Sequence, residues 1–532
     1  MKRKWLFYFT GFISGLSVMA IELGASRLMA PYFSSSQIVW TIIIGTIMIA
    51  MALGNVIGGR MADKYKTPDR LFGWIFAAAT WTMLIPLVGK FIIAGTALVL
   101  ALFVKTGYLV VAAFVSCILV FVFPLMVLGM VTPNLVKYAV TSLEENGRTC
   151  GIIEACNTVG SIIGTFLPTF VTIPYVGTSM TFVIFASILY IVCIVYFFFR
   201  KKNRVKASSI ACVALAAGVL STNIGTAFWA DNIIYEGESI YNYLRVEDTP
   251  RELIFSTNVL FGVQSIKRKT PGLSKMFFDY DLAAPIMAGA GENPEISVLI
   301  LGLGTGTFAT QCEYYFGISD IDGVEIDGKI IELSHEYFDL PECVNTYAQD
   351  GRAFIASTDK MYDAIMVDAY QDITIPFQMS SIEFFKEVKS HLKPGGAVAI
   401  NMNMFSESDS GKTINDWLCG TVTNVFDSVY SVRASSNLEL FCSDSYDVHE
   451  QLEAKLGTIE DNELYRFMRD ISDSLEKVEK TDLILTDDKA PVELLSMRVL
   501  DEMINEELEY LKGSIKGKGI KELYDMLVSG EF

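Results

Sequence analysis

The sequence has little of what a metal site or a disulfide framework needs. Its nine cysteines are scattered singly without a Cys-x-x-Cys pair, and its three histidines (His335, His391 and His449) lie far apart in the chain. We therefore expect neither a structural zinc site nor a disulfide framework, and no metal cofactor. Single cysteines are typical of a reducing compartment.

The second part of the chain lacks the basic excess that nucleic-acid binding requires. Residues 207–532 carry 25 Lys/Arg against 54 Asp/Glu, a balance of −29, whereas residues 1–206 carry 17 against 6, a balance of +11. An acidic surface argues against nucleic acid as a partner. It would suit a cationic partner such as a polyamine, although acidity also serves solubility.

What the first part has in abundance is apolar sequence. Of the 532 residues, 52% are hydrophobic, and the mean hydropathy is +0.39. A bilayer core requires roughly 20 apolar residues per helix. Six segments meet this requirement: Trp5–Met29, Ile38–Gly58, Leu71–Val88, Tyr108–Val131, Ile152–Ile173 and Thr178–Phe199. Two weaker ones are the short Phe91–Val104 and the Ala-rich Ser208–Phe228.

Three basic clusters predict how these spans are oriented. Lys2-Arg3-Lys4, residues 60–70 and residues 200–206 should all be cytoplasmic by the positive-inside rule. Six spans place all three clusters in the cytoplasm, and eight place the third cluster outside. Seven spans would place the following domain outside. We expect an even count, six or eight, in an integral inner-membrane protein whose soluble domain faces the cytoplasm. The basic start is interpreted as a retained first span rather than a signal peptide.

After about residue 230 the pattern changes to short β-type runs alternating with amphipathic helices. The predicted strands are Tyr241–Val246, Glu252–Phe255, Ile296–Leu301, Ile321–Val324, Ala364–Val367 and Val398–Ile400, and the predicted helices are Phe308–Phe316, Gly328–Phe338 and Ser381–Leu392. This alternation predicts a Rossmann-like α/β domain with a mostly parallel sheet. The expected domains are a polytopic membrane domain (1–206), a weak span or linker (207–232), a β-rich element (233–292), the Rossmann-like domain (293–498) and a helical tail (499–532).

A glycine-rich turn follows the first strand of this domain. It reads Leu301-Gly302-Leu-Gly304-Thr305-Gly306, and Glu325 ends the next strand. Glycines allow the backbone to approach a ligand closely, and an acid about 20 positions on can accept hydrogen bonds from both ribose hydroxyls. Dinucleotide and adenosyl sites share this pattern, and such a turn can also be purely structural.

Two later features favour an adenosyl sulfonium. Asp350-Gly351 follows the second helix, where a carboxylate can accept a bond from an adenine amino group. Asp368, with Tyr370 and Asp372 close behind, follows the third strand at the sheet edge where open α/β sheets bind ligands. Alkyl transfer requires an unprotonated, aligned amine, and a carboxylate can take its proton and hold it in line. Alternatively, Asp368 only caps a turn.

Residues 235–442 resemble the aminopropyltransferase (spermidine synthase) family. The resemblance rests on motifs in the family's order, namely Glu238-Ser-Ile-Tyr241-Asn, Gly262-Val-Gln264, the glycine turn, Val324-Glu325-Ile-Asp327, Asp350-Gly351 and Val367-Asp368. It implies that Gln264, Glu325 and Asp350 contact the nucleoside, together with the glycine turn and Gly351. It also implies that Asp368 is the base or amine-orienting carboxylate, and that Tyr241 lines the acceptor pocket.

The whole chain resembles the subfamily in which such a domain is fused to a membrane domain. Its signatures are Glu22-Leu-Gly-Ala-Ser-Arg27, Trp40-Thr, Gly58-Gly-Arg60-Met-Ala-Asp63, Asn157-Thr-Val-Gly160-Ser161 and Leu485-Thr-Asp487-Asp488-Lys-Ala-Pro491-Val-Glu493. Asp279 and Asp488 are further candidate substrate residues. The expected partners are a polyamine or other amine and the lipid bilayer, with a homo-oligomer allowed and no nucleic acid.

The chain departs from the family in ways that leave the substrates open. Thr305 stands where soluble members usually have an Asp that holds the amine of decarboxylated S-adenosylmethionine, so ordinary S-adenosylmethionine is an alternative co-substrate. The Tyr-His-Glu order usual near Phe277–Pro285 is absent, although Asp279 and Asp281 are present. The second acid of the catalytic loop falls on Gln371 by strict spacing, or on Asp372 with a one-residue shift.

Polar residues also interrupt the apolar spans, namely Glu22, Arg27, Asn55, Glu154 and Asn157. Such residues usually face a bundle interior or an aqueous cavity. They form either a pathway for a cationic substrate or internal pairs such as Glu22 with Arg27. Three functions therefore compete: a membrane-bound alkyl (aminopropyl) transferase or methyltransferase, a polyamine synthase–transporter fusion, and a nucleoside sensor without catalysis.

Overall fold

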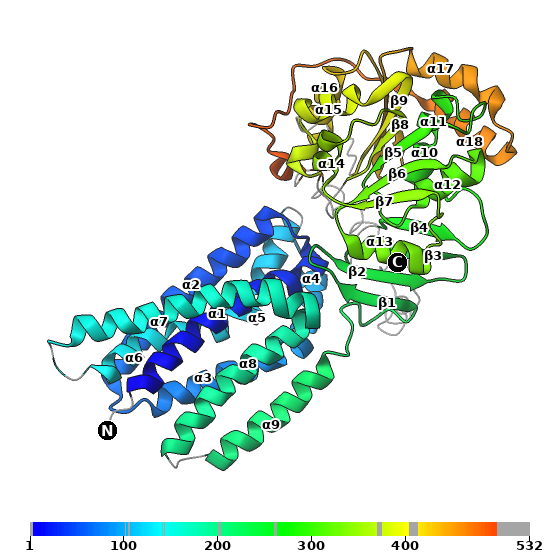
Figure 1. The fold of residues 1–532 in the computed structure, drawn as a ribbon. Helices are drawn as coiled ribbons and strands as arrows, with labels where there is room; N and C mark the ends of the chain where they lie inside the picture. Colours follow the sequence, from blue (N-terminus) through cyan, green and yellow to red (C-terminus); the bar gives the residue numbers. More distant parts are fainter. Residues whose placement is uncertain are drawn as a thin grey trace. The chain divides into compact units, whose positions relative to one another are not determined.

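The computed structural model describes residues 4–101, 103–104, 107–140, 142, 144–200, 204–259, 263–369, 375–403, 413–496 and 499. The chain forms two compact units, one reaching Asp231 and the other starting at Asn232. We call them unit 1 and unit 2 and describe each by itself (Figure 1).

Unit 1 consists of helices over its described residues. They are α1 (Lys4–Phe33), α2 (Gln37–Lys64), α3 (Asp69–Leu84), α4 (Lys90–Ala101), α5 (Tyr108–Gly129), α6 (Val131–Ala139), α7 (Asn146–Leu167), α8 (Ile173–Arg200) and α9 (Arg204–Ser221). Five continuous stretches are long and apolar enough to cross a membrane: Lys4–Phe33, Gln37–Lys64, Asp69–Ala101, Tyr108–Ala139 and Asn146–Arg200.

All six strongly apolar segments predicted from the sequence are helical. The stretch Asn146–Arg200 has 55 residues, far more than one crossing needs. It is divided at Gly177, where φ 79° and ψ 169° leave helical geometry within the first turns of α8, so the stretch consists of one helical segment before Gly177 and another after it. The weaker segment Phe91–Val104 overlaps α4, which continues α3 through a π-helical turn at Ile85–Gly89 and is not a separate span.

Side-chain contacts identify the two ends of unit 1. At one end, which we call the basic end, Lys4 pairs with Glu145 at 2.9 Å and Arg200 with Asp69 at 3.1 Å. At the opposite end, the Tyr32 hydroxyl donates to the carbonyl of Thr226. Helix α9 therefore runs back along the bundle, and the chain leaves unit 1 at the end opposite to Lys4. The expectation of an even number of spans accordingly requires that α9 does not cross the bilayer.

Unit 2 begins with a small antiparallel sheet in the order β1 (Ile233–Glu238), β2 (Tyr243–Asp248), β3 (Glu252–Ser256) and β4 (Ser265–Arg268). Its apolar face packs on α13 (Gly328–Tyr337). The shared core consists of Leu244, Val246 and Phe255 from the sheet and of Ile330, Leu333 and Phe338 from α13 and its end. This packing ties the small sheet to the domain that follows it.

The following domain is built on an eight-stranded sheet in the order β12-β10-β11-β9-β8-β5-β6-β7. The strands are β5 (Ser297–Leu301), β6 (Asp320–Glu325), β7 (Val344–Ala348), β8 (Tyr362–Val367), β9 (Leu392–Met402), β10 (Ser428–Ala434), β11 (Asn437–Ser443) and β12 (Glu476–Lys477). Strands β5 to β9 pair in parallel, whereas β10, β11 and β12 pair antiparallel at one edge. The predicted Rossmann-like architecture is confirmed.

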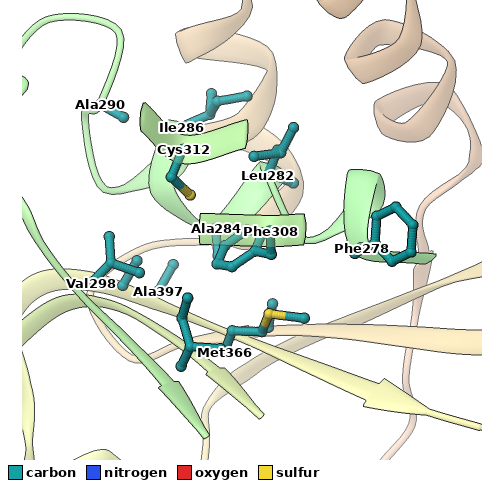
Figure 2. Packing of buried hydrophobic residues seen from close by; sticks show 14 of the residues in the cluster. Phe278, Leu282, Ala284, Ile286, Ala290, Val298, Phe308, Cys312, Met366 and Ala397 are labelled. Atoms are coloured by element: carbon teal, nitrogen blue, oxygen red, sulfur yellow. The ribbon is translucent and has the colours of Figure 1, made fainter. Parts of the chain in front are cut away.

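Helices cover both faces of this sheet (Figure 1). One face carries α10 (Phe277–Tyr280), α11 (Ala283–Met287), α12 (Thr307–Phe316), α17 (Val448–Lys455) and α18 (Asn462–Ser474), and the other carries α14 (Gly351–Ser357), α15 (Ile382–Ser390) and α16 (Ile414–Thr423). Figure 2 shows the first face, where Phe278 and Phe308 lie over Met366 of β8. This apolar layer reaches the carboxyl ends of the central strands, where the candidate site lies.

Candidate active site

A cavity of about 360 Å³ lies at the carboxyl ends of β5, β6 and β8. Eight of the predicted site residues line it: Tyr241, Gln264, Gly302, Gly304, Glu325, Asp350, Gly351 and Asp368. They come from the small sheet and from four segments of the large one. The cavity is within the size range of small-ligand pockets, and its position is where open α/β sheets bind nucleotides.

The glycine turn forms one wall of the cavity. Gly302 has φ 99°, and a Cβ atom there would lie 2.1 Å from the carbonyl oxygen of Asp368, so no other residue fits. The amide of Gly304 donates to the Glu325 carboxylate at 3.0 Å. Gly306, with φ 84°, precedes α12 directly. The turn therefore brings backbone, Glu325 and Asp368 together, as a nucleoside site requires.

Glu325 is buried at the end of β6. Its carboxylate accepts bonds from the amides of Gly304 and Asp327, at 3.0 and 3.1 Å. Burial raises the pKa of Glu325 to about 7, against the lowering effect of these bonds. A buried carboxylate held in this way can accept hydrogen bonds from two adjacent hydroxyls.

Asp350 and Gly351 are held at the cavity by a salt bridge behind them. Asp350 caps α14 by accepting a bond from the amide of Ala353 at 2.9 Å. The next residue but one, Arg352, donates to both carboxylate oxygens of Asp487 at 2.6 and 2.8 Å. Asp487 belongs to the C-terminal signature, so this bidentate pair links that signature to the wall of the cavity.

Tyr241 reaches the cavity from the turn between β1 and β2. The Ser239 hydroxyl accepts bonds from the amides of Tyr241 and Asn242, at 3.0 and 2.9 Å, and itself donates to Asp327. Asp327 also caps α13 by accepting from Lys329. Asp327, at the start of α13, thus positions Tyr241 through Ser239.

Asp368 follows β8 and is the carboxylate nearest to the expected chemistry. The Asn401 side chain donates to it at 2.6 Å and accepts in turn from Asn437 at 2.8 Å. Burial raises the pKa of Asp368 to about 7, the Asn401 bond lowers it, and the charge of Glu325 raises it. A carboxylate with this pKa can both accept and release a proton near neutral pH.

Two fully buried carboxyl groups, Asp281 and Glu439, lie behind Asp368. Glu439 pairs across the sheet with Asn401, the residue that bonds Asp368. Burial raises the pKa of both groups well above the usual range, and the charge of Asp368 raises each further. Neither carboxyl group has a hydrogen-bond partner among the described residues. Burial without a donor or a cation disfavours the charged form of both groups.

Some predicted residues lie elsewhere. Thr305 and Thr307 line a separate hollow of about 230 Å³ behind the glycine turn, and only Thr307 also lines the main cavity. Asp279 accepts bonds from Ser274, Lys275 and Gln311, away from the cavity. Asp488 is exposed in the turn between Thr486 and Lys489. The structure therefore does not bring Asp279 or Asp488 to Tyr241. Tyr370 and Asp372 lie outside the described residues.

Four of the five polar residues that interrupt the apolar spans belong to two closely packed helices, whereas Asn55 is exposed on α2. Glu22 and Arg27 are half-buried on α1, and on α7 Asn157 is half-buried and Glu154 exposed. A Cβ atom at Gly160 would lie 1.9 Å from the carbonyl oxygen of Phe12, so α1 and α7 approach with backbones almost touching. The absence of a side chain at Gly160 thus allows the two helices to pack closely.

Sequence reasoning missed several residues near the site. Ser265, Phe278 and Met379 line the cavity, and Asn401 and Glu439 support Asp368. Glu439 could have been identified from the sequence, because it is an acid between apolar neighbours in a strand. Among the described residues, no group of three or more His, Cys, Asp or Glu is arranged to hold a metal ion.

Comparison with known proteins identifies the family. Residues 285–433 match the spermine/spermidine synthase domain. A probable polyamine aminopropyl transferase of Bifidobacterium longum is 42% identical over 348 residues, which is 61% of this chain and 76% of the relative. The chain belongs to the polyamine aminopropyltransferase family. It is accordingly a transferase enzyme.

Two further matches have lower sequence identity. Polyamine aminopropyltransferase 2 of Pseudomonas aeruginosa is 30% identical over 202 residues, 34% of this chain and 56% of that one. A crystal structure of a probable spermidine synthase from Corynebacterium glutamicum has 17% identity and a TM-score of 0.35, covering 46% of this chain and 95% of that one. The fold assignment rests on the strand order described above.

Proposed function

We propose that the chain is a membrane-bound aminopropyltransferase that joins the aminopropyl group of decarboxylated S-adenosylmethionine to an amine such as putrescine. The new bond joins the amine nitrogen to the propyl carbon, and the bond from that carbon to sulfur breaks. The products are a polyamine, methylthioadenosine and a proton. The observation that carries the proposal is Asp368, a half-buried carboxylate whose pKa is raised to about 7, in the same cavity as the glycine turn and Glu325.

The residues of the cavity suit the two substrates. Glu325 would accept from the ribose hydroxyls, Gln264 and Asp350 would contact the nucleoside, and the glycine turn would allow the close approach. Asp368 would remove a proton from the amine and hold it in line with the leaving sulfur, while Tyr241 lines the acceptor side. Holding the reactants in this geometry accounts for a large part of such a rate enhancement.

A second candidate, transfer from ordinary S-adenosylmethionine, is favoured by one observation. Thr305 supplies no carboxylate and lines the hollow behind the turn rather than the main cavity. Nothing at this position therefore repels a co-substrate that keeps its own carboxylate.

Calorimetry of the detergent-purified protein with S-adenosylmethionine, its decarboxylated form and methylthioadenosine tests both candidates. Tighter binding of the decarboxylated form supports the polyamine synthase. A preference for the carboxylated form would replace it by methyl or another alkyl transfer. Binding of none of the three would refute both.

We further propose that unit 1 is embedded in the inner membrane with its basic end in the cytoplasm, and that unit 2 also faces the cytoplasm. The first part follows from the apolar helices and the charge distribution. The second follows from the location of the co-substrate. Because α9 runs from the basic end to the end where Tyr32 contacts Thr226, the two parts exclude each other if α1 crosses the whole bilayer, and the labelling experiment below decides between them.

Labelling of single cysteines in intact cells tests this orientation. Cys150 is exposed near the basic end and Cys343 is partly exposed on unit 2, so two variants that each keep one of them are compared. We expect an impermeant reagent to label neither before lysis. Labelling of Cys343 alone in intact cells would place unit 2 outside.

A further inference from the structure

A hollow of about 590 Å³ opens at the basic end of unit 1. Its walls come from four separate places in the chain, namely the start of α1, the loop between α2 and α3, the end of α6 and the end of α8. None of the proposed catalytic residues contributes to it. It is therefore independent of the active-site cavity in unit 2.

Three cations line this hollow: Lys66, Lys137 and Arg200. Its described lining contains no Asp or Glu. Arg200 bonds Asp69 at 3.1 Å, and Lys137 lies 3.6 Å from Asp63. That second pair is weak, because the two side chains are 56% and 82% exposed.

Lys66 is exposed and forms no hydrogen bond or ion pair with any described residue. Three cations thus face the hollow, whereas the two carboxylates that offset them lie outside its lining. The hollow is therefore a net positive site that suits an anion.

Three tyrosines give the hollow a fixed polar frame. The Tyr138 hydroxyl donates to the carbonyl of Tyr65 at 2.9 Å, and the Tyr196 hydroxyl donates to Asp69. The guanidinium of Arg70 lies 4.5 Å from the centre of the Tyr65 ring. Because hydrogen bonds and a cation–π contact hold these groups, the loop needs little ordering when a ligand binds.

The remaining lining is apolar and decides what kind of anion fits. Leu6, Phe7 and Phe199 form part of the same hollow, and the exposed Trp5 packs edge-on against Phe199. A free phosphate would gain nothing from this apolar wall, whereas a phospholipid would lay its acyl chains along it. Basic pockets between membrane helices on the cytoplasmic side bind anionic head groups in this way.

We propose that the hollow binds the head-group phosphate of an anionic phospholipid, with Lys66, Lys137 and Arg200 around the phosphate and the acyl chains along Leu6, Phe7 and Phe199. The proposal rests on the membrane embedding of unit 1 proposed above. It does not rest on the transferase activity of unit 2. Aminopropyl transfer measured on the same preparation therefore separates a failure of this proposal from a failure of the proposed function.

The experiment titrates the full-length, detergent-purified protein with dioleoyl-phosphatidylglycerol and counts bound lipid by native mass spectrometry. The test variant is Lys66→Gln/Lys137→Gln, since both side chains are exposed. The matched control is Arg60→Gln/Arg148→Gln, which removes two exposed cations that do not line the hollow. Each lysine contributes about fivefold in affinity, so we expect the test variant to bind roughly 25-fold more weakly.

The control should bind as wild type does, and so should Lys66→Arg/Lys137→Arg, which shows that the charge and not a folding defect is responsible. Equal binding by wild type and the glutamine variant would overturn the proposal. Equal binding of dioleoyl-phosphatidylcholine would do the same. Displacement of the lipid by an equal concentration of inorganic phosphate would identify a free anion as the ligand instead. A protein that stays soluble without detergent would refute the embedding itself.

Discussion

Strands β6 and β8 each carry an acid that pairs with a lysine and an acid, at the carboxyl end, that lies at the cavity. Asp322 in β6 and Asp363 in β8 contact lysines, at 2.8 Å from Lys360 and from Lys393 respectively. Burial tends to raise the pKa of both, but these lysines and further donors hold each pKa below its usual range.

At the carboxyl ends of the same strands the acids have no lysine partner among the described residues, and their pKa values are shifted upward. Glu325 and Asp368 form no ion pair with a described Lys or Arg, and burial raises the pKa of each to about 7. One set of acids is paired with lysines within the fold, whereas the other lies at a cavity whose described lining contains no Lys or Arg. The difference indicates that a ligand with hydroxyls or positive charge supplies the missing partner.

The largest expected effect comes from removing one acid of each set. Asp368→Asn should reduce aminopropyl transfer by roughly 10²- to 10⁴-fold, because the amide cannot take the proton. Asp363→Asn is the matched control, with the same change in the same strand, and should keep most of the activity. Steady-state rates with decarboxylated S-adenosylmethionine and putrescine provide the measurement. Equal losses in both variants would show that the two sets do not differ in function.

Glu325→Gln should act on binding rather than on the chemical step. The amide keeps the shape but loses one acceptor and the charge, and a hydrogen bond to a charged group contributes about 1.5–3 kcal/mol. We therefore expect a loss of roughly 10- to 150-fold in affinity for methylthioadenosine, measured by calorimetry. An unchanged affinity would mean that Glu325 only braces the glycine turn through Gly304 and Asp327.

The sequence predicts the acids of the cavity better than the residues that support them. Glu325 and Asp368 were found because they end strands in a known spacing. Asn401 and Glu439 lie in β9 and β11, and their neighbourhood depends on the cross-strand register, which no local pattern reveals. Asp279 was selected by its place in a motif, yet the fold uses it to bind Ser274, Lys275 and Gln311.

The helices of unit 1 likewise divide into features that the sequence predicts and features that depend on distant contacts. Six apolar helices follow from length and composition, because burial in lipid imposes a strong local constraint. The continuity of α3 with α4 and the return of α9 depend on contacts between distant residues, such as Lys90 with the carbonyl of Ile224. Neither can be read from hydropathy.

Replacing Asp368 or Asp363 should also change the thermal stability, by a smaller amount and in opposite directions. The pKa of Asp368 is raised in the folded state, so the stability associated with its protonated form is lost as pH rises from about 4 through 7. The pKa of Asp363 is lowered, so its contribution is present above about 4 and lost as pH falls further. At pH 8, Asp368→Asn should therefore raise the melting temperature, whereas Asp363→Asn should lower it, each by about 1–4 °C. Shifts of the same sign would contradict the comparison.

The smallest expected effect concerns the pair behind the catalytic carboxylate. Since Asp368 acts as a base when ionised, kcat/KM should rise with pH and level off above about 7. The double variant Asp281→Asn/Glu439→Gln replaces both acids of the pair, whose charges interact with that of Asp368, by neutral side chains of the same shape. With less negative charge nearby, Asp368 should ionise more easily, so the acid limb of the profile should move to lower pH by less than about 1 unit.

A merely structural role for the pair would change the rate at every pH equally and leave the limb where it is. The substitution Cys442→Ala, in the same strand as Glu439 and also buried, is the matched control and should leave the limb unmoved. A shift of the limb in the double variant alone would show that the buried acids around the cavity titrate together.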